Sequence, residues 1–371
     1  MEQPTVKIVF AGGGTGGHLF PALVVARAFR RRRPDAEISF IGARRGLERR
    51  LVPQAGFPLR TLRLSALKGR GALARIVAAA EAAWAVCRCA VWMVGSRPGL
   101  VIGVGGYASG PAVLAARLLK VRTMVLEQNH FPGATNRWLA PRVDAVCLPS
   151  EEARDRLGGL GIVTGNPVRA EFFEIGEPEA GRTLSVLVCG GSRGARSINR
   201  AMTDALEQLG RLPEPPRIVH QTGVDDEAAV RAAYAAYPSD RWEVHAFVED
   251  MPARLAAADL VLCRSGATTL AELTAAGRAA MLVPYPFAAD DHQWHNAEAL
   301  RRAGAAEVVR DAELTGRRIA EFVAGSDADR ERLRAMGRAA RALGRPEATE
   351  AICDIAEGLL ASDVEGGGDV S

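Results

Sequence analysis

The sequence predicts an α/β protein made of two doubly wound domains, and three observations lead to this prediction. Short runs rich in Val, Ile and Leu alternate with longer helical stretches along most of the 371 residues. The runs are apolar at successive positions, which is typical of strands buried on both faces of a parallel sheet. The alternation starts again after Asn166-Pro167, and a chain of this length is long enough for two domains.

The first series of strands is expected at residues 6–11, 37–43, 100–106, 122–128 and 144–150. The second series is expected at residues 183–191, 217–223, 242–248, 259–265 and 278–286. Helices between the strands make βαβ units, so each series forms a parallel sheet. We place the domain boundary in GNPVR at 165–169, because a proline disfavours continuation of a helix. The N-terminal domain then spans 1–166 and the C-terminal domain 167–344, and a last helix at about 345–362 is expected to pack back on the first domain.

Charge is distributed unevenly along the chain. Residues 1–120 hold 19 Lys and Arg against 5 Asp and Glu, a net charge of +14, whereas the whole chain has a net charge of only +4. A basic N-terminal segment suits an anionic partner such as nucleic acid, phospholipid or a phosphorylated substrate. The alternative is a solvated, Arg-rich surface without a partner.

The cysteines and apolar stretches argue against a disulfide-rich or zinc-binding protein and against a membrane-spanning one. The six cysteines form no C-x-x-C pair, and several lie in apolar runs, so we expect reduced thiols in a cytosolic protein and no zinc site. Residues 72–94 approach the length of a membrane span, but Arg75, Glu81 and Arg88 would each cost about 2.5–3.5 kcal/mol near the bilayer centre. We therefore expect a packed or interfacial helix there. The N-terminal VKIVF reads as a strand and lacks the pattern of a secretory signal peptide.

The first expected strand ends in a glycine-rich turn. Gly12, Gly14 and Gly17 fit the pattern G-x-G-x-x-G, and such a loop between a strand and a helix lets backbone N–H groups approach a phosphate. The second expected strand ends in FIGARRG, which offers no acidic residue for an adenosine ribose. A dehydrogenase that binds a 2′-phosphate through Arg44 or Arg45 remains an alternative.

Three more turns of small residues follow expected strands, at 103–111, 190–195 and 264–269. Ligands of doubly wound sheets bind at the carboxyl ends of the strands, and helix N-termini there carry roughly half a positive charge. One such turn can be turn chemistry alone. Together they predict two Rossmann-like domains that face each other across a cleft, one for a nucleotide diphosphate and one for an acceptor, which is the GT-B architecture.

Seven motifs in this order resemble the MurG family, and the resemblance spans almost the whole chain. They are GGTGGHLFPAL (13–23), GVGGYASGP (103–111), LEQN (126–129), GNPVR (165–169), GGSRGA (190–195), CRSGATTLAE (263–272) and DHQWHNA (291–297). The resemblance implies an inverting glycosyltransferase that moves N-acetylglucosamine from UDP-N-acetylglucosamine to the C4 hydroxyl of N-acetylmuramic acid in undecaprenyl-pyrophosphoryl-N-acetylmuramoyl-pentapeptide (lipid I). The products would be lipid II and UDP.

The resemblance also implies where the protein works and with what. It implies a peripheral protein at the cytoplasmic face of the bacterial cell membrane, acting in peptidoglycan synthesis and so in cell shape and division. Its expected partners are the anionic membrane surface and other cell-wall synthesis proteins, with no nucleic acid. No metal or other cofactor is expected, because no D-x-D motif is apparent where a metal-dependent donor site would use one, and helix N-termini with Arg would stabilise the leaving diphosphate.

The family motifs imply roles for individual residues. His18 is the expected catalytic base, since its ordinary pKa of about 6.5 suits proton transfer, and Glu127 is the rival. Tyr107 and Ser109 are expected to contact the acceptor. The residues expected to bind the donor are Thr15, Gly16, Gly17, Asn129, Arg169, Ser192, Val248, Ala267, Thr268, Thr269, Leu270, Ala271, Glu272 and Gln293.

Specific donor contacts follow from these motifs. Ser192 and Arg169 would contact the diphosphate, and the start of the helix at 267–269 would receive a phosphate. Glu272 would accept hydrogen bonds from the ribose hydroxyls, and the Val248 backbone would meet the uracil edge. Gln293 would read the sugar hydroxyls. Ordinary helix chemistry is the alternative for Ser192, Glu272 and Gln293.

An expected membrane-docking patch combines apolar and basic residues. Leu73, Ile76, Val77 and Trp84 would form its apolar part, and each basic residue beside them would contribute about 1 kcal/mol on anionic lipid. The flanking basic residues are Lys68, Arg70 and Arg75. A buried crossover helix is the alternative. For the whole chain, the alternatives are another GT-B sugar-nucleotide enzyme such as an epimerase, an NADP-dependent oxidoreductase, and a non-catalytic nucleotide sensor or scaffold.

Overall fold

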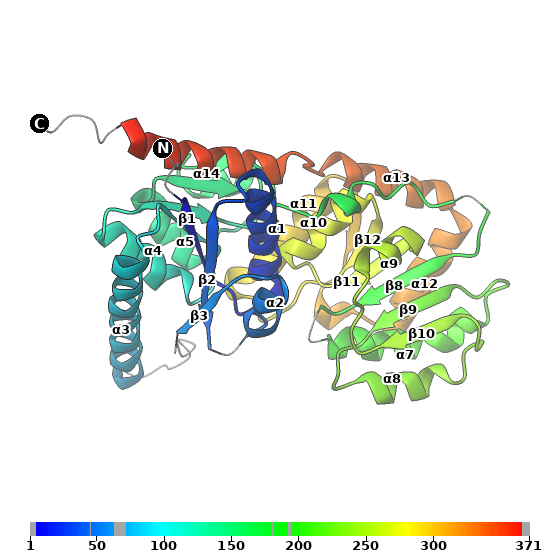
Figure 1. The fold of residues 1–371 in the computed structure, drawn as a ribbon. Helices are drawn as coiled ribbons and strands as arrows, with labels where there is room; N and C mark the ends of the chain where they lie inside the picture. The colour runs from blue at the N-terminus through cyan, green and yellow to red at the C-terminus, as the bar shows by residue number, and fades with distance from the viewer. Residues whose placement is uncertain (1–4, 45, 63–71, 180, 192–193, 366–371) are drawn as a thin grey trace, which may run out of the picture. The chain divides into compact units, whose positions relative to one another are not determined.

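The computed structural model describes residues 5–44, 46–62, 72–179, 181–191 and 194–365, and the side chains of 72–75, 78 and 362–365 lie outside this description. The chain divides into two compact units (Figure 1). Unit 1 comprises Met1–Pro167 and Glu347–Ser371, and unit 2 comprises Val168–Pro346.

Unit 1 contains a parallel sheet with the strand order β3-β2-β1-β4-β5-β6-β7. In this order the strands are Leu59–Leu62, Glu37–Ala43, Lys7–Ala11, Leu100–Gly103, Arg122–Leu126, Ala145–Leu148 and Ile162–Val163. The helices are α1 (Gly16–Arg32), α2 (Glu48–Gln54), α3 (Ala72–Ser96), α4 (Ser109–Leu118), α5 (Ala134–Leu139), α6 (Glu151–Arg156) and α14 (Ala348–Glu365). A short 3-10 turn, Ala140–Arg142, follows α5.

The two faces of this sheet have separate cores. Ile8 and Phe10 of β1 pack in a cluster with residues of α1 and α14. Val9 and Ala11, which alternate with them, pack in a second cluster with residues of α3 and α4. Side chains on a strand point alternately to opposite faces, so a strand covered on both sides is apolar at every position.

Unit 2 repeats this design with the strand order β10-β9-β8-β11-β12-β13, again all parallel. In this order the strands are Trp242–His245, Arg217–Gln221, Ser185–Cys189, Leu260–Cys263, Ala279–Leu282 and Ala306–Val308. The helices are α7 (Arg196–Gly210), α8 (Glu227–Tyr234), α9 (Met251–Ala257), α10 (Ala267–Ala276), α11 (His292–Arg302), α12 (Gly316–Ala328) and α13 (Arg330–Ala342). Short 3-10 turns lie at Ala170–Phe172, Ala289–Asp291 and Asp311–Glu313.

The prediction of two doubly wound α/β domains is confirmed, and every expected strand segment contains a strand. Three strands were not expected, namely β3, β7 and β13, all of which lie at sheet edges. Both sheets switch strand order beside their first strand, β1 or β8, and doubly wound sheets bind ligands at such points.

Two helices complete unit 1 in different ways. The C-terminal helix α14, red in Figure 1, places Ile352 and Cys353 in the core beside α1. Arg32 at the end of α1 pairs with Asp354 at 2.6 Å and also with Glu350. Helix α3 covers residues 72–96, and no helix in the described ranges is long and apolar enough to cross a membrane.

Candidate functional site

Two glycine-rich turns of unit 1 pack backbone against backbone at the carboxyl ends of β1 and β4. Gly12 and Gly13 have φ values of +146° and +128°, which L side chains rarely adopt. A Cβ on Gly12 would lie 2.3 Å from the carbonyl oxygen of Gly105, and one on Gly106 would lie 2.3 Å from that of Gly13. Glycine is therefore required at these positions because no side chain fits between the two turns.

His18 lies where these two turns meet. It belongs to the first turn of α1, whose N-cap Thr15 makes no side-chain capping bond. The Thr15 hydroxyl lies 3.3 Å from His18 Nδ1, and a Cβ on Gly105 would lie 2.7 Å from His18 Cδ2. Gly16 and Gly17 form the start of the helix, where backbone amides favour an anion. Tyr107, half exposed, follows the second turn.

Glu127 is buried, and its carboxylate is fully engaged. Its Oε1 accepts the N–H groups of Gln128 and Asn129 at 2.9 and 2.8 Å and the Asn129 side-chain amide at 3.0 Å. Its Oε2 accepts the Gly133 N–H at 2.9 Å and the Asn136 side-chain amide at 2.8 Å. Five hydrogen bonds fix the loop after β5 around this carboxylate, so the structure speaks against Glu127 as the catalytic base. Asn129, expected at the donor sugar, is held by the same carboxylate.

Ser109, the other expected acceptor residue, lies in the core of unit 1. Its side chain is fully buried, and its hydroxyl has no hydrogen-bond partner among the described residues. A Cβ on Gly103 would lie 2.6 Å from that hydroxyl, so the serine fits against a glycine of β4. This burial speaks against an acceptor contact at Ser109. Tyr107 is the more accessible of the two expected acceptor residues.

The structure adds a carboxylate that the sequence reasoning missed. Glu48 is buried, and it accepts hydrogen bonds from the Gly14 and Ala43 backbone N–H groups. An acidic residue that meets a glycine-rich turn is expected at the end of the second strand, whereas Glu48 begins the following helix, α2, and folds back on the first glycine-rich turn. In the sequence, Glu48 could have been found as an acidic residue that follows two closely spaced glycines, Gly42 and Gly46, and precedes the apolar residues of α2.

In unit 2, helix α10 begins at the carboxyl end of β11. Its N-cap is Gly266, which makes no side-chain capping bond. Ala267 and Leu270 are buried, whereas Thr268 and Thr269 are partly exposed. The first-turn amides of such a helix, with roughly half a positive charge, form a site for phosphate.

Glu272 lies in the second turn of α10, next to Ala271, and its side chain is partly exposed. Burial raises the pKa of the Glu272 carboxyl to about 7, and the positive charge of Arg169 opposes the shift. Arg169 itself pairs with Glu171 at 2.7 Å and places its guanidinium 4.8 Å from the centre of the Phe172 ring. A carboxyl that titrates near neutral pH is common at functional sites.

Gln221, at the end of β9, connects two neighbouring turns. Its Oε1 accepts the Val248 N–H at 2.9 Å, and its Nε2 donates to the Gly191 carbonyl at 3.0 Å. Because the Val248 N–H is already used, a contact of its backbone with a nucleobase would be made by the carbonyl. Ser192, which follows Gly191, lies outside the described residues.

Gln293 fixes the loop between β12 and α11. Its Oε1 accepts the Tyr285 N–H at 3.0 Å, which leaves its amide nitrogen as the group for a ligand. Two consecutive aspartates before it, Asp290 and Asp291, adopt φ values of +52° and +49°. Strained backbone of this kind is typical of binding loops, where the surrounding structure holds it in place.

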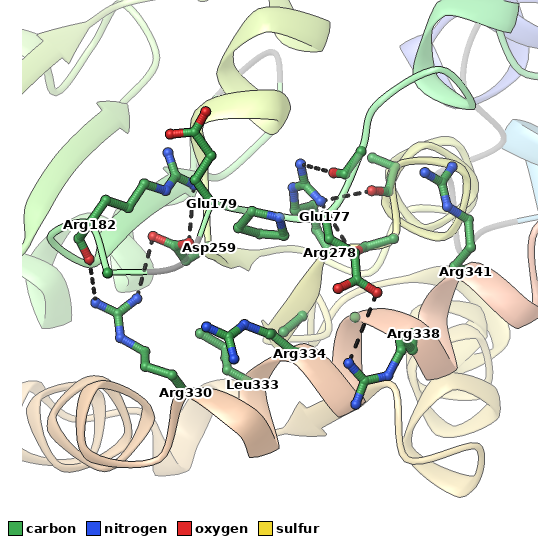
Figure 2. Close-up of a pocket in the computed structure, with 17 residues that line it drawn as sticks. Glu177, Glu179, Arg182, Asp259, Arg278, Arg330, Leu333, Arg334, Arg338 and Arg341 are labelled. Carbon is green, nitrogen blue, oxygen red and sulfur yellow. Dashed lines mark hydrogen bonds and ion pairs between the residues drawn. The ribbon is translucent and has the colours of Figure 1, made fainter.

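A cavity of about 290 Å³ lies at the opposite, amino-terminal ends of the unit 2 strands, beside one face of α13 (Figure 2). Six arginines line it: Arg182, Arg278, Arg330, Arg334, Arg338 and Arg341.

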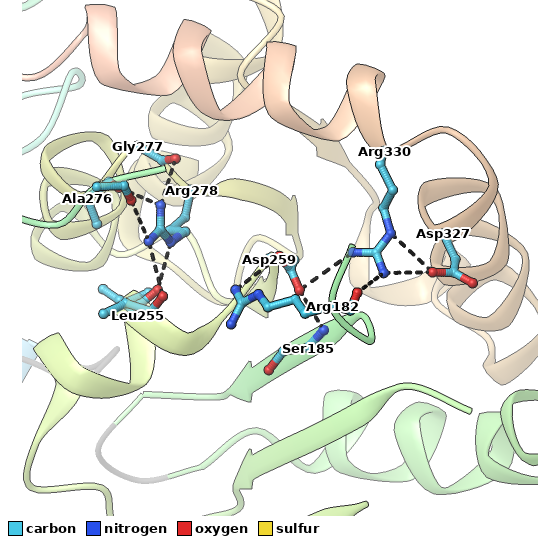
Figure 3. Close-up of polar contacts among 11 residues, drawn as sticks. Arg182, Ser185, Leu255, Asp259, Ala276, Gly277, Arg278, Asp327 and Arg330 are labelled. Carbon is cyan, nitrogen blue, oxygen red and sulfur yellow. Dashed lines mark hydrogen bonds and ion pairs between the residues drawn. The ribbon is translucent and has the colours of Figure 1, made fainter. Parts of the chain in front are cut away.

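The guanidinium groups of these arginines form hydrogen bonds and ion pairs with other residues of unit 2. Arg278 donates to carbonyl groups that include Leu255 and Ala276, at the ends of α9 and α10 (Figure 3). Asp259 accepts from Arg182 at 3.0 Å and from the Ser185 N–H at 2.7 Å. We therefore interpret this network as structural: it caps helix C-termini and joins the starts of the strands.

Metal ligands do not cluster in the part of the chain that the structure describes. No group there of three or more His, Cys, Asp and Glu side chains could hold an ion. The metal-independent reaction expected from the sequence stays a prediction, because only a measurement with a chelator tests it.

Two protein-family models match successive parts of the chain. Residues 8–148 match the glycosyltransferase family 28 N-terminal domain, and residues 185–353 match the glycosyltransferase family 28 C-terminal domain. Together these matches cover well over half of the chain.

Curated relatives match over nearly their whole length. One from Myxococcus xanthus is 43% identical over 96% of this chain and 93% of its own, and one from Geobacter sp. strain M21 is 42% identical over 94% of both. Both are named UDP-N-acetylglucosamine--N-acetylmuramyl-(pentapeptide) pyrophosphoryl-undecaprenol N-acetylglucosamine transferase.

Solved structures show the same fold. The crystal structure of Acinetobacter baumannii MurG is 31% identical and superposes with a TM-score of 0.78, covering 95% of this chain and 99% of its own. A putative UDP-N-acetylglucosamine 2-epimerase from Listeria monocytogenes, 15% identical with a TM-score of 0.67 and covering 94% and 95%, shares the fold alone. The chain belongs to glycosyltransferase family 28 and, within it, to the MurG family of N-acetylglucosamine transferases.

Proposed function

We propose that this protein transfers N-acetylglucosamine from UDP-N-acetylglucosamine to the C4 hydroxyl of N-acetylmuramic acid in lipid I, with inversion at C1, and so makes lipid II for peptidoglycan. One observation of the structure carries the proposal furthest. Glu272 lies more than one turn into α10, whose first-turn amides follow the N-cap Gly266, so that a phosphate and a ribose diol can bind along the same helix. The names of relatives at 42–43% identity supply the substrates.

The donor binds to unit 2 in this proposal. The amides of residues 267–269 bind a phosphate. The ionised Glu272 carboxylate accepts hydrogen bonds from the ribose hydroxyls. The Val248 carbonyl accepts the N3–H of uracil, since its own N–H is held by Gln221. Gln293 presents its side-chain amide to the sugar, because its oxygen is held by the Tyr285 N–H.

The acceptor binds to unit 1, with His18 as the base. The C4 hydroxyl oxygen attacks C1 of the donor sugar as its proton passes to the His18 imidazole. The bond between C1 and the diphosphate oxygen breaks, and its electron pair leaves with UDP. Thr15, 3.3 Å from Nδ1, orients the ring so that Nε2 takes the proton.

Stabilisation of the leaving diphosphate needs no metal ion in this account. The N-terminus of α10 and the side chain of Arg169 supply positive charge where negative charge develops. Transfer should therefore continue in a chelator. Loss of activity in EDTA that Mg²⁺ restores would contradict this part of the proposal.

Exposed apolar residues on α3 support a peripheral association with the membrane. Ile76, Val77, Trp84, Val91 and Val94 are each at least 49% exposed along this helix. The Arg88 guanidinium, 5.9 Å from the Trp84 ring centre, adds positive charge beside them. Such a surface binds the interface of an anionic bilayer without crossing it. The expected basic neighbours Lys68 and Arg70, and the side chains of Leu73 and Arg75, lie outside the description.

Sedimentation with lipid vesicles tests the membrane proposal. Wild-type protein should bind vesicles that contain anionic lipid, and Trp84→Glu with Val91→Glu should reduce the bound fraction at least tenfold. Glutamates at Leu343 and Val224, which are exposed apolar residues of unit 2, provide the matched control. Equal binding by both double variants would contradict this role for α3.

Product analysis tests the transferase proposal. Purified protein should convert a lipid I analogue and UDP-N-acetylglucosamine in detergent into a product heavier by one N-acetylhexosamine residue. A β linkage in that product would establish inversion. If the donor changes only to its 2-epimer and no disaccharide forms, the protein is an epimerase and the proposal is wrong.

A further inference from the structure

We infer that Glu48 is a positioning residue for the transfer reaction, because its buried carboxylate fixes the glycine-rich turn that carries Thr15 and His18. This inference rests on the proposed function. It concerns a residue that neither touches the proposed substrates nor takes part in proton transfer. Three sets of contacts support it: the hydrogen bonds of the carboxylate, the glycines around it, and the connection from the turn to His18.

The carboxylate joins two segments of unit 1 that are far apart in sequence. Oε2 accepts the Gly14 N–H at 3.0 Å, and Oε1 accepts the Ala43 N–H at 2.8 Å at the end of β2. The side chain is 1% exposed. A charge buried to this extent persists only where hydrogen bonds compensate for lost hydration. The first glycine-rich turn is thus held to the end of β2 through this side chain.

Three glycines make room for this carboxylate. A Cβ on Gly46 would lie 2.2 Å from Glu48 Oε2, and a Cβ on Gly42 would lie 2.7 Å from Glu48 Cγ. A Cβ on Gly13 would lie 3.0 Å from the carboxyl carbon. Gly13 belongs to the first glycine-rich turn, whereas Gly42 and Gly46 belong to the end of β2 and the connection to α2. The position of the carboxylate is therefore enforced by close packing as well as by its hydrogen bonds.

The turn transmits this position to His18. Gly14 precedes Thr15, the N-cap of α1, and the Thr15 hydroxyl lies 3.3 Å from His18 Nδ1. The same turn also donates hydrogen bonds from the Gly12 N–H to the Ile41 carbonyl at 2.9 Å and from the Gly13 N–H to the Gly105 carbonyl at 3.3 Å. Glu48 adds a side-chain hydrogen bond at Gly14, four residues before His18. Displacement of a reacting group by about 1 Å can reduce a rate by about 100-fold.

The same contact distinguishes this turn from a dinucleotide-binding loop. A phosphate bound by a glycine-rich loop needs free amides, but the Gly14 amide is occupied by a carboxylate. A second negative charge there would be repelled. The turn therefore serves to hold α1, and anions are left to the helix N-terminus that follows.

Two variants disturb the contacts of the Glu48 carboxylate in different ways. Glu48→Gln keeps the size of the side chain but removes its charge and turns an NH₂ group toward one of the two amides. Gly46→Ala keeps the charge and pushes it aside. Both should lower kcat by about 10- to 100-fold. The KM for UDP-N-acetylglucosamine should stay within about twofold, because the nucleotide and sugar contacts proposed above are made by residues of unit 2.

Asp144→Asn is the matched control for a purely structural effect. Asp144 also accepts a backbone N–H, that of Thr123 at 2.7 Å, but it precedes β6, which lies on the other side of β1 in the sheet. Melting temperatures of all variants are measured with the rate constants. The inference holds if both Glu48→Gln and Gly46→Ala lose kcat and an equally destabilised Asp144→Asn keeps it.

Two results would overturn the inference. One is a kcat within twofold of wild type in either folded variant, and the other is an equal loss of kcat in Asp144→Asn. If Glu48→Gln does not fold, Gly46→Ala decides alone. Wild-type protein without acceptor-dependent transfer would instead refute the proposed function, and this is measured before any variant is compared.

Discussion

Binding of the donor should depend on pH through Glu272. The pKa of this carboxyl is raised to about 7 by burial, so it is largely protonated at about pH 6 and largely ionised at about pH 8. If the ribose diol binds only the ionised form, the apparent KM is multiplied by one plus the ratio of protonated to ionised carboxyl. That factor is about 11 at pH 6 and about 1.1 at pH 8. The KM for UDP-N-acetylglucosamine should therefore fall about tenfold over this range.

Steady-state kinetics at saturating acceptor measures this effect directly. The two phosphates of the donor stay ionised throughout the range, so they do not contribute to the change. Glu272→Gln removes the titrating group, and its KM should be higher than that of wild type at about pH 8 and independent of pH. A wild-type KM that is constant within twofold would refute the reasoning. A pH dependence that persists in Glu272→Gln would assign the titration to another group.

The remaining predictions concern stability and the turns. Because the folded state holds the Glu272 proton up to about pH 7 but the unfolded state only to about pH 4.5, the free energy of unfolding should fall as pH rises between these values, and urea titrations of Glu272→Gln should lack that fall. His18→Ala should lower kcat at least 100-fold, and a loss below about fivefold would remove it as the base. Gly106→Ala, whose Cβ would lie 2.3 Å from the Gly13 carbonyl oxygen, should abolish transfer while calorimetry still detects UDP binding. Asp259→Asn should cost about 1.5–3 kcal/mol in urea unfolding and leave the donor KM unchanged.

The fold could be predicted because a strand that is buried on both faces is apolar at successive positions, and this pattern is visible in the sequence. The residues of β1 alternate between two cores and are all apolar, so the strand is visible without any knowledge of its neighbours. Edge strands leave a weaker record. In β3, Arg60 and Thr61 are exposed, and β13 has only three residues, so neither shows an apolar run.

The candidate site could be predicted where local conformation demands a residue type. Gly12 and Gly106 are required by positive φ and close backbone contact, and their spacing shows in the sequence. Roles set by tertiary contacts do not show there. Glu127 resembles a catalytic acid or base in its motif, but its loop surrounds it with five donors. Glu48 resembles an ordinary acid at the start of a helix, and only the folded unit places it under the glycine-rich turn.

Release of UDP from UDP-N-acetylglucosamine, with and without a lipid I analogue and in the presence of EDTA, tests the central claim most directly. We expect release that requires the acceptor and survives the chelator, because the amides of α10 and Arg169 replace a metal ion. Release that is equally fast without the acceptor, or none with it, would contradict the assignment of this protein as a lipid I transferase.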